Sequence, residues 1–107
     1  MSEITVTTTP GIEGEEVETY LGVVSGEAVM GANVVKDFLA GIRDVVGGRS
    51  ESYEKEILKG RKEAVKDISA RAEEEGADAV VGVGFDYEEI REGVLWITVT
   101  GTAVRFQ

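Results

Sequence analysis

The fold is decided by a C-terminal stretch, residues 77–106, which reads ADAVVGVGFDYEEIREGVLWITVTGTAVRF. Its second half has the period-two alternation of a strand with one apolar face. The apolar positions are Leu95, Ile97 and Val99, and those between and after them are Trp96, Thr98, Thr100 and Thr102. The first half places bulky residues at alternate positions of one predicted face, namely Val81, Val83, Phe85 and Tyr87. Because Glu92-Gly93 makes a turn between the two halves, we expect an antiparallel hairpin.

Two further strands are expected before this hairpin. Residues 4–8 alternate apolar residues with threonine, and residues 17–25, which follow an acidic turn, form the second predicted strand. Gly22 and Gly26 indicate a bulge or a close approach of the backbone in the second of these strands.

The middle of the chain has the period of a helix. Residues 33–46 carry a wide apolar stripe, with Asn33 as the N-cap and Gly47-Gly48 at the end. A second, longer helix begins at Ser50 and stops at Gly76. The predicted order is β-β-α-α-β-β, which describes a single α+β domain of 107 residues with two helices packed on a mainly antiparallel sheet.

The chain contains neither cysteine nor histidine. Disulfides, thiolate or imidazole metal sites, cysteine nucleophiles and Ser-His-Asp triads are therefore excluded, and no cofactor is expected. Side chains could bind only a hard, oxygen-preferring ion such as Mg²⁺ or Ca²⁺, and whether they bind one stays open. There is neither a bilayer-spanning apolar run nor a signal-peptide pattern, so we expect a cytoplasmic protein without a membrane partner.

Acidic residues outnumber basic ones by 21 to 11, and the formal net charge is −10. Such a surface repels phosphate groups, and we expect no nucleic-acid partner because the sequence shows no evident basic stripe. The acidity fits adaptation to a salty cytoplasm or an ordinary acidic protein equally well.

Three segments carry a resemblance to a known family. They read LGVVSGEAVMGANVVKDFLAGIRDVVGGRSESYEKEI, GADAVVGVGFDYE and WITVTGTAV. They resemble the YbjQ family of small bacterial and archaeal proteins, whose activity is unassigned and whose label is heavy-metal binding. The resemblance covers residues 4–106 and implies a dodecin-like subunit that assembles into a ring-shaped homopentamer.

Self-association also has support from the residues themselves. Apolar residues surround the first predicted helix, and a monomer would leave much of this apolar surface exposed. The alternative is a well-packed monomer with a helix on each face of the sheet.

The candidate ligand site is the corner between the two predicted helices. Its glycines expose backbone N–H groups, its arginines are positively charged, and its serine and tyrosine supply hydroxyls. The residues are Arg43, Gly47, Gly48, Arg49, Ser50 and Tyr53. Around a ring they could form an anion or small-ligand pocket at each subunit boundary. Alternatively, Arg49 pairs with a carboxylate of a neighbouring subunit and the glycines only turn the chain.

A second glycine-containing segment has the spacing of a phosphate-binding loop without its chemistry. Gly26 and Gly31 match that spacing, but Ala32 and Asn33 stand where the loop needs Lys and Ser or Thr. Glu27 also places a carboxylate where phosphates would lie. We therefore expect a loop that contacts a neighbouring subunit, and the alternative is a backbone nest that binds an anion.

Other side chains have both a functional and a structural explanation. Asp86, Glu88 and Glu89 could bind Ca²⁺ or act in acid-base catalysis, but a solvated strand end explains them as well. Trp96 and Tyr87 could stack against a planar ligand, although aromatic residues on strands usually belong to a core or an interface.

These features favour a non-enzymatic, homo-oligomeric small-ligand or anion binder, or a scaffold, whose partner is a further copy of itself. The alternative is a protein that binds a hard metal ion through carboxylates. An enzyme acting at the subunit boundary through Arg49 and Tyr53 has least support, because the chain supplies no recognisable base.

Overall fold

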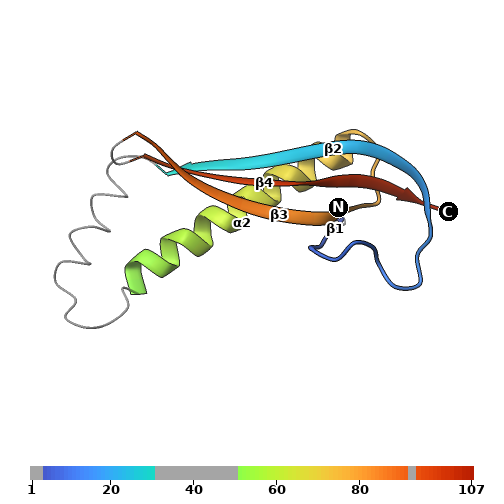
Figure 1. The fold of residues 1–107 in the computed structure, drawn as a ribbon, viewed down its shortest axis with the longest axis horizontal. Helices are drawn as coiled ribbons and strands as arrows, with labels where there is room; N and C mark the ends of the chain where they lie inside the picture. Colours follow the sequence, from blue (N-terminus) through green and yellow to red (C-terminus); the bar gives the residue numbers. More distant parts are fainter. Residues whose placement is uncertain (1–3, 31–50, 92–93) are drawn as a thin grey trace.

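The computed structural model describes residues 4–30, 51–91 and 94–107. Its elements are β1 (Thr5–Val6), β2 (Val17–Met30), α2 (Glu51–Glu74), β3 (Ala79–Arg91) and β4 (Val94–Phe106). In this part of the chain one long helix lies on one face of a four-stranded mixed sheet (Figure 1). The α+β class and the second predicted helix are confirmed. The first predicted helix, residues 33–46, lies outside the described residues.

The strands lie in the order β1-β3-β4-β2. β4 pairs antiparallel with both β3 and β2, whereas the short β1 pairs parallel with the start of β3. The predicted hairpin of β3 and β4 is confirmed, since Phe85 lies opposite Val99 and Tyr87 opposite Ile97. The long strands are therefore antiparallel, as expected, and the parallel pairing is confined to one short edge.

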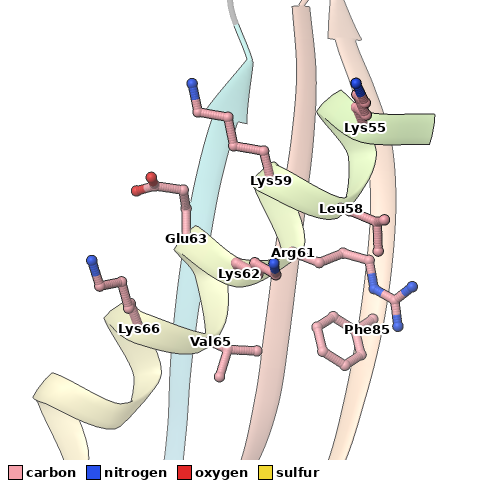
Figure 2. A pocket seen from close by; sticks show the side chains of 9 residues that line it. All are labelled: Lys55, Leu58, Lys59, Arg61, Lys62, Glu63, Val65, Lys66 and Phe85. Carbon is pink, nitrogen blue, oxygen red and sulfur yellow. The ribbon is translucent and has the colours of Figure 1, made fainter. Parts of the chain in front are cut away.

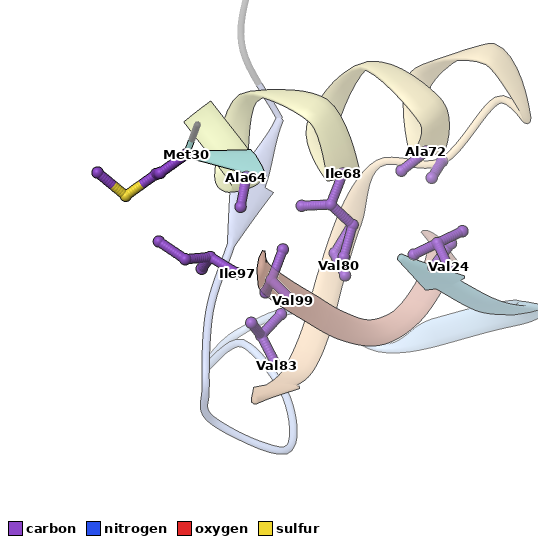
Figure 3. Close-up of a cluster of buried hydrophobic side chains, with 11 residues drawn as sticks. Val24, Met30, Ala64, Ile68, Ala72, Val80, Val83, Ile97 and Val99 are labelled. Carbon is purple, nitrogen blue, oxygen red and sulfur yellow. The ribbon is translucent and has the colours of Figure 1, made fainter. Parts of the chain in front are cut away.

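The main core lies between α2 and the sheet (Figure 3). Ile97 and Val99 are fully buried in it, which confirms the apolar face predicted for β4. Its other fully buried members are Ala64, Ile68, Ala72, Val80 and Ala103. None of the side chains buried in the described residues is polar or charged. The core of this part of the chain is therefore purely apolar.

β3 departs from the predicted alternation near its start. A register shift lies between Val81 and Gly84, where Gly82 has a φ of 62°. As a result Val83 packs in the core under α2, while Val81 belongs to a smaller cluster on the other side of the sheet. The prediction that these two valines share a face is wrong, because a bulge inserts an extra residue between them.

β2 is longer than predicted, since it continues past Ser25 to Met30 and stays paired with β4. Of the two alternatives predicted for Gly22, a bulge or a close backbone approach, the structure shows the bulge: the register shifts between Tyr20 and Gly22, and the glycine has a φ of 117°. The extra length places Gly26 inside a strand.

Gly26 and Glu27 lie opposite Val99 and Thr98, so the prediction that they form a loop is wrong. The glycine allows close packing: a Cβ at this position would collide with the backbone of α2 at Ala64 and Ile68. The close backbone approach predicted for Gly26 is therefore confirmed.

α2 is joined to the edge of the sheet by Asp67. Its Oδ2 accepts the backbone N–H of Glu27 at 3.0 Å and lies 3.2 Å from Nη2 of Arg71. The helix ends as predicted at Gly76, which has a φ of 81°. Among the described residues, no helix combines the length and apolar character needed to cross a membrane.

Candidate functional site

Most residues of the predicted ligand site lie outside the described part of the chain. Tyr53 is in the first turn of α2. The others are Arg43, Gly47, Gly48, Arg49 and Ser50, together with Gly31 and Asn33 of the predicted subunit contact. The helix-corner site therefore stays a prediction.

The structure contains a different candidate, a groove of about 880 Å³ along the outer side of α2, where Phe85 of β3 joins residues of the helix (Figure 2). We call it the α2 groove. Its lining residues are Lys55, Leu58, Lys59, Arg61, Lys62, Glu63, Val65, Lys66 and Phe85.

The α2 groove concentrates positive charge in an acidic protein. Five of its lining residues are cationic and one, Glu63, is anionic. The cationic side chains are exposed, so their charge is available to a binding partner. This local excess opposes the net charge of −10 carried by the whole chain. A negatively charged surface or ligand would therefore be attracted to this one side of the molecule.

The groove also has an apolar component. Phe85 is half-buried beside α2, and the guanidinium carbon of Arg61 lies 5.0 Å from the centre of its ring. Leu58 is 51% exposed, and Val65 is half-buried. Cation-π contact holds Arg61 over the aromatic ring. The groove can therefore receive a partner that combines apolar and acidic groups.

A second surface lies on the other side of the sheet, and we call it the reverse face. It is defined by the cross-strand sets Val23–Thr102–Val81, Ser25–Thr100–Gly84, Glu27–Thr98–Asp86 and Val29–Trp96–Glu88, with Tyr20 opposite Val104. Three of its side chains are large, apolar and exposed: Tyr20 at 72%, Val23 at 83% and Val29 at 59%. No described helix covers this face.

The reverse face is acidic as well as apolar. Its carboxylates are Glu27, Asp86 and Glu88, and none of its defining residues is Lys or Arg. The indole Nε1 of Trp96 donates a 2.7 Å hydrogen bond to Oε2 of Glu27. This bond fixes an acidic side chain beside a half-buried aromatic ring.

The two aromatic residues predicted to stack against a planar ligand lie on opposite faces of the sheet. Trp96 belongs to the reverse face, whereas Tyr87 lies opposite Ile97, whose side chain is in the core under α2. Within one chain they cannot hold the same ligand, because the sheet separates them. The pattern of alternation already placed them on different strands but could not show their relative register.

The carboxylates of β3 do not form one cluster. Asp86 and Glu88 lie on the reverse face, and Glu89 lies opposite Leu95 on the other face. Across residues 4–30, 51–91 and 94–107, no group of three or more Asp, Glu, His or Cys side chains could hold a metal ion. The described part of the chain thus offers no ready site for a multiply coordinated cation.

Together these features define a small α+β protein in which a helix with a basic outer groove covers one face of a mixed sheet and leaves an acidic, apolar face on the other side. A family model with the description "Putative heavy-metal-binding" matches residues 4–107. The chain belongs to this family, the YbjQ family, as its sequence had indicated.

Relatives in two bacteria support this assignment. The chain is 55% identical to the UPF0145 protein of Halalkalibacterium halodurans over 101 residues, which is 94% of each chain. It is 52% identical to the UPF0145 protein of Geobacillus kaustophilus over 102 residues, covering 95% of this chain and 97% of the relative. Neither name states an activity.

A solved structure shares the fold. It is the crystal structure of a DUF74 protein of unknown function from Pediococcus pentosaceus, and the two align with a TM-score of 0.61 over 97% of this chain and 98% of the other. At 14% identity the similarity concerns the fold alone.

The family description names heavy metals, but this chain has no thiolate or imidazole with which to bind them.

The basic side of α2 differs from the prediction that the chain has no basic stripe. Lys55, Lys59, Lys62 and Lys66 follow at spacings of four, three and four residues, which places them along one side of a helix. The signal was present in the spacing, but the large excess of acidic residues concealed it.

Proposed function

We propose that this protein is non-enzymatic and works as an assembly of identical copies, either as a scaffold or as a small-ligand binder. The observation that carries the proposal is the reverse face, where large apolar side chains are exposed beside carboxylates. The resemblance to the YbjQ family favours a ring of five copies. The absence of histidine and cysteine from the sequence removes the commonest catalytic bases and nucleophiles.

The energetic argument for assembly rests on Tyr20, Val23 and Val29. Each is more than half exposed, and they lie along one strand at the edge of the sheet. Full burial of a side chain of this size contributes about 1.5 kcal/mol or more. A small domain has little core area in reserve, so a partner that covers this face would add materially to its stability.

Native mass spectrometry of the freshly purified full-length chain tests the proposal. We expect a pentamer, and any retained small molecule would appear as added mass. A monomer at micromolar concentration would contradict the proposed assembly.

A second candidate function is the binding of a small anion in the α2 groove, because five cationic side chains line it. Isothermal titration with inorganic pyrophosphate tests this directly. The second candidate predicts saturable binding that is lost in Lys59→Glu/Lys62→Glu. Heat changes that do not saturate would contradict it.

A further inference from the structure

We infer that the α2 groove of one copy receives the reverse face of a second copy, head to tail. The inference rests on the proposed assembly and names the two surfaces that would form it.

Charge complementarity is the first argument. The groove presents Lys59, Lys62 and three further cations, whereas the reverse face presents Glu27, Asp86 and Glu88 without a cation among its defining residues. Oppositely charged surfaces guide two molecules into one orientation and disfavour others. The two surfaces lie on opposite sides of the same sheet (Figure 1). Within one copy they approach each other at the β2 edge, where Lys59 lines a small pocket together with Glu27 and Val29.

The apolar groups of the two surfaces also match. In the groove, Leu58 and Phe85 lie among the cations. On the reverse face, Val23, Val29 and Trp96 lie among the carboxylates. Contact between these apolar groups would remove them from water, while the charges around them form pairs at the rim. This is the usual arrangement of a protein interface, with an apolar centre and a polar rim.

The lengths of the two surfaces agree. From Lys55 to Lys66 the helix advances by about 16 Å, at about 1.5 Å per residue. From Val23 to Val29 the strand advances by about 20 Å, at about 3.3 Å per residue. A helix lying along the reverse face could therefore place its cations opposite the two cross-strand sets that contain carboxylates, Glu27–Thr98–Asp86 and Val29–Trp96–Glu88.

The same geometry determines the symmetry of the assembly. Because the two surfaces differ, the contact is heterologous, and each copy uses one of each. Such contacts close into a ring when the rotation between copies permits it. Packing two reverse faces against each other is disfavoured. It would bring Glu27, Asp86 and Glu88 of one copy close to the same carboxylates of the other copy, and like charges repel.

Charge reversal tests the inference, with subunit count measured by native mass spectrometry and analytical ultracentrifugation. Lys59→Glu/Lys62→Glu changes the groove, and Asp86→Lys/Glu88→Lys changes the reverse face. We expect each double variant to raise the dissociation constant of the assembly by about 100-fold, because it leaves like charges opposed. The quadruple variant restores opposite charges with the signs exchanged, and we expect it to regain the wild-type subunit count.

Glu74→Lys/Glu89→Lys is the matched control. It makes the same change in net charge as the reverse-face variant, but Glu74 ends α2 and Glu89 lies on the helix side of the sheet. We expect it to assemble as the wild type does. Circular dichroism of every variant checks that the fold is retained.

The other outcomes are separable. If both double variants keep the wild-type subunit count, the inference is wrong and the assembly uses another surface. If the groove variant loses pyrophosphate binding while its subunit count is unchanged, the groove holds a small anion instead of a second copy. If the double variants dissociate and the quadruple variant does not recover, the pairing of these two surfaces is wrong. If the wild type is a monomer, the proposed function itself fails.

Discussion

Trp96 and Glu27 are joined across the reverse face by a 2.7 Å hydrogen bond between the indole Nε1 and a carboxylate oxygen. The bond links neighbouring strands, because Trp96 is in β4 and Glu27 is in β2. The chain has one tryptophan, so its fluorescence reports on this face alone.

We expect the emission of Trp96 to shift to longer wavelength when the assembly is diluted to monomers. The reason is that a partner seated on the reverse face would shield the half-buried indole from water. Fluorescence and sedimentation measured over the same dilution series should change at the same concentration. Dissociation without any spectral change would mean that the interface lies elsewhere.

Replacing Glu27 by alanine removes the acceptor of the indole N–H. We expect the free energy of unfolding to fall by about 1 kcal/mol, the usual effect of losing one partly exposed hydrogen bond. Glu27→Gln is the control, because its amide oxygen can still accept the bond. Urea denaturation measures both, and equal losses in the two variants would show that the charge matters more than the bond.

Replacing Gly26 by alanine should destabilise the protein more strongly, by about 2 kcal/mol or more. The added Cβ would collide with backbone atoms of Ala64 and Ile68, which cannot move without displacing α2. Gly11→Ala is the control, since a Cβ there meets no atom within 4 Å. If both variants unfold at the same urea concentration, the close packing of β2 against α2 is not present in solution.

Asp67 makes two contacts, a hydrogen bond with the backbone N–H of Glu27 and an ion pair with Arg71, and we expect the hydrogen bond to contribute more to stability. Asp67→Ala removes the acceptor of an edge-strand N–H together with the ion pair to Arg71, and we expect a loss of about 1 to 2 kcal/mol. Arg71→Ala removes the ion pair alone and should cost less than about 1 kcal/mol, because the Arg71 side chain is 49% exposed. If Arg71→Ala lowers the free energy of unfolding more than Asp67→Ala does, the ion pair contributes more than the hydrogen bond and the prediction is wrong.

Much of the fold follows from patterns that act over a few residues. The alternation in β4 was sufficient to predict that strand, and Gly76 was sufficient to predict where α2 ends. The face on which Val81 lies could not be predicted. One extra residue in the bulge moves every later side chain of β3 to the opposite face of the sheet from the one that simple alternation assigns relative to Val81. The strand role of Gly26 was likewise hidden, since the helix that requires a glycine there lies about forty residues away in the sequence.

The candidate sites were harder to predict than the fold. Charge totals describe the whole surface, but the α2 groove depends on where a minority of cations is placed. Helical spacing would have revealed Lys55, Lys59, Lys62 and Lys66. Their relation to Phe85 depends on a strand that is distant in sequence, so it required the structure.

We expect the protein to retain no zinc or copper after dialysis, whatever its family description. Without cysteine or histidine it lacks the ligands that bind these ions tightly. Metal analysis of protein purified without an affinity tag and dialysed against buffer measures the retained ions, and Mg²⁺ and Ca²⁺ are measured in the same samples. One equivalent of zinc per chain would contradict the expectation. One equivalent of Mg²⁺ or Ca²⁺ would support the alternative function, the binding of a hard metal ion through carboxylates.

Salt should weaken the assembly if the α2 groove and the reverse face form it. Raising NaCl from about 0.1 M to about 1 M shortens the Debye length from about 10 Å to about 3 Å and screens the charges at the rim. Sedimentation at both concentrations should therefore show a higher dissociation constant in high salt, and the quadruple charge-reversed variant should show the same trend. Adaptation to a salty cytoplasm predicts the opposite, because dense carboxylates repel one another most in dilute buffer. An assembly that forms only in molar KCl would favour habitat as the cause of the acidity and would contradict an interface held by these charges.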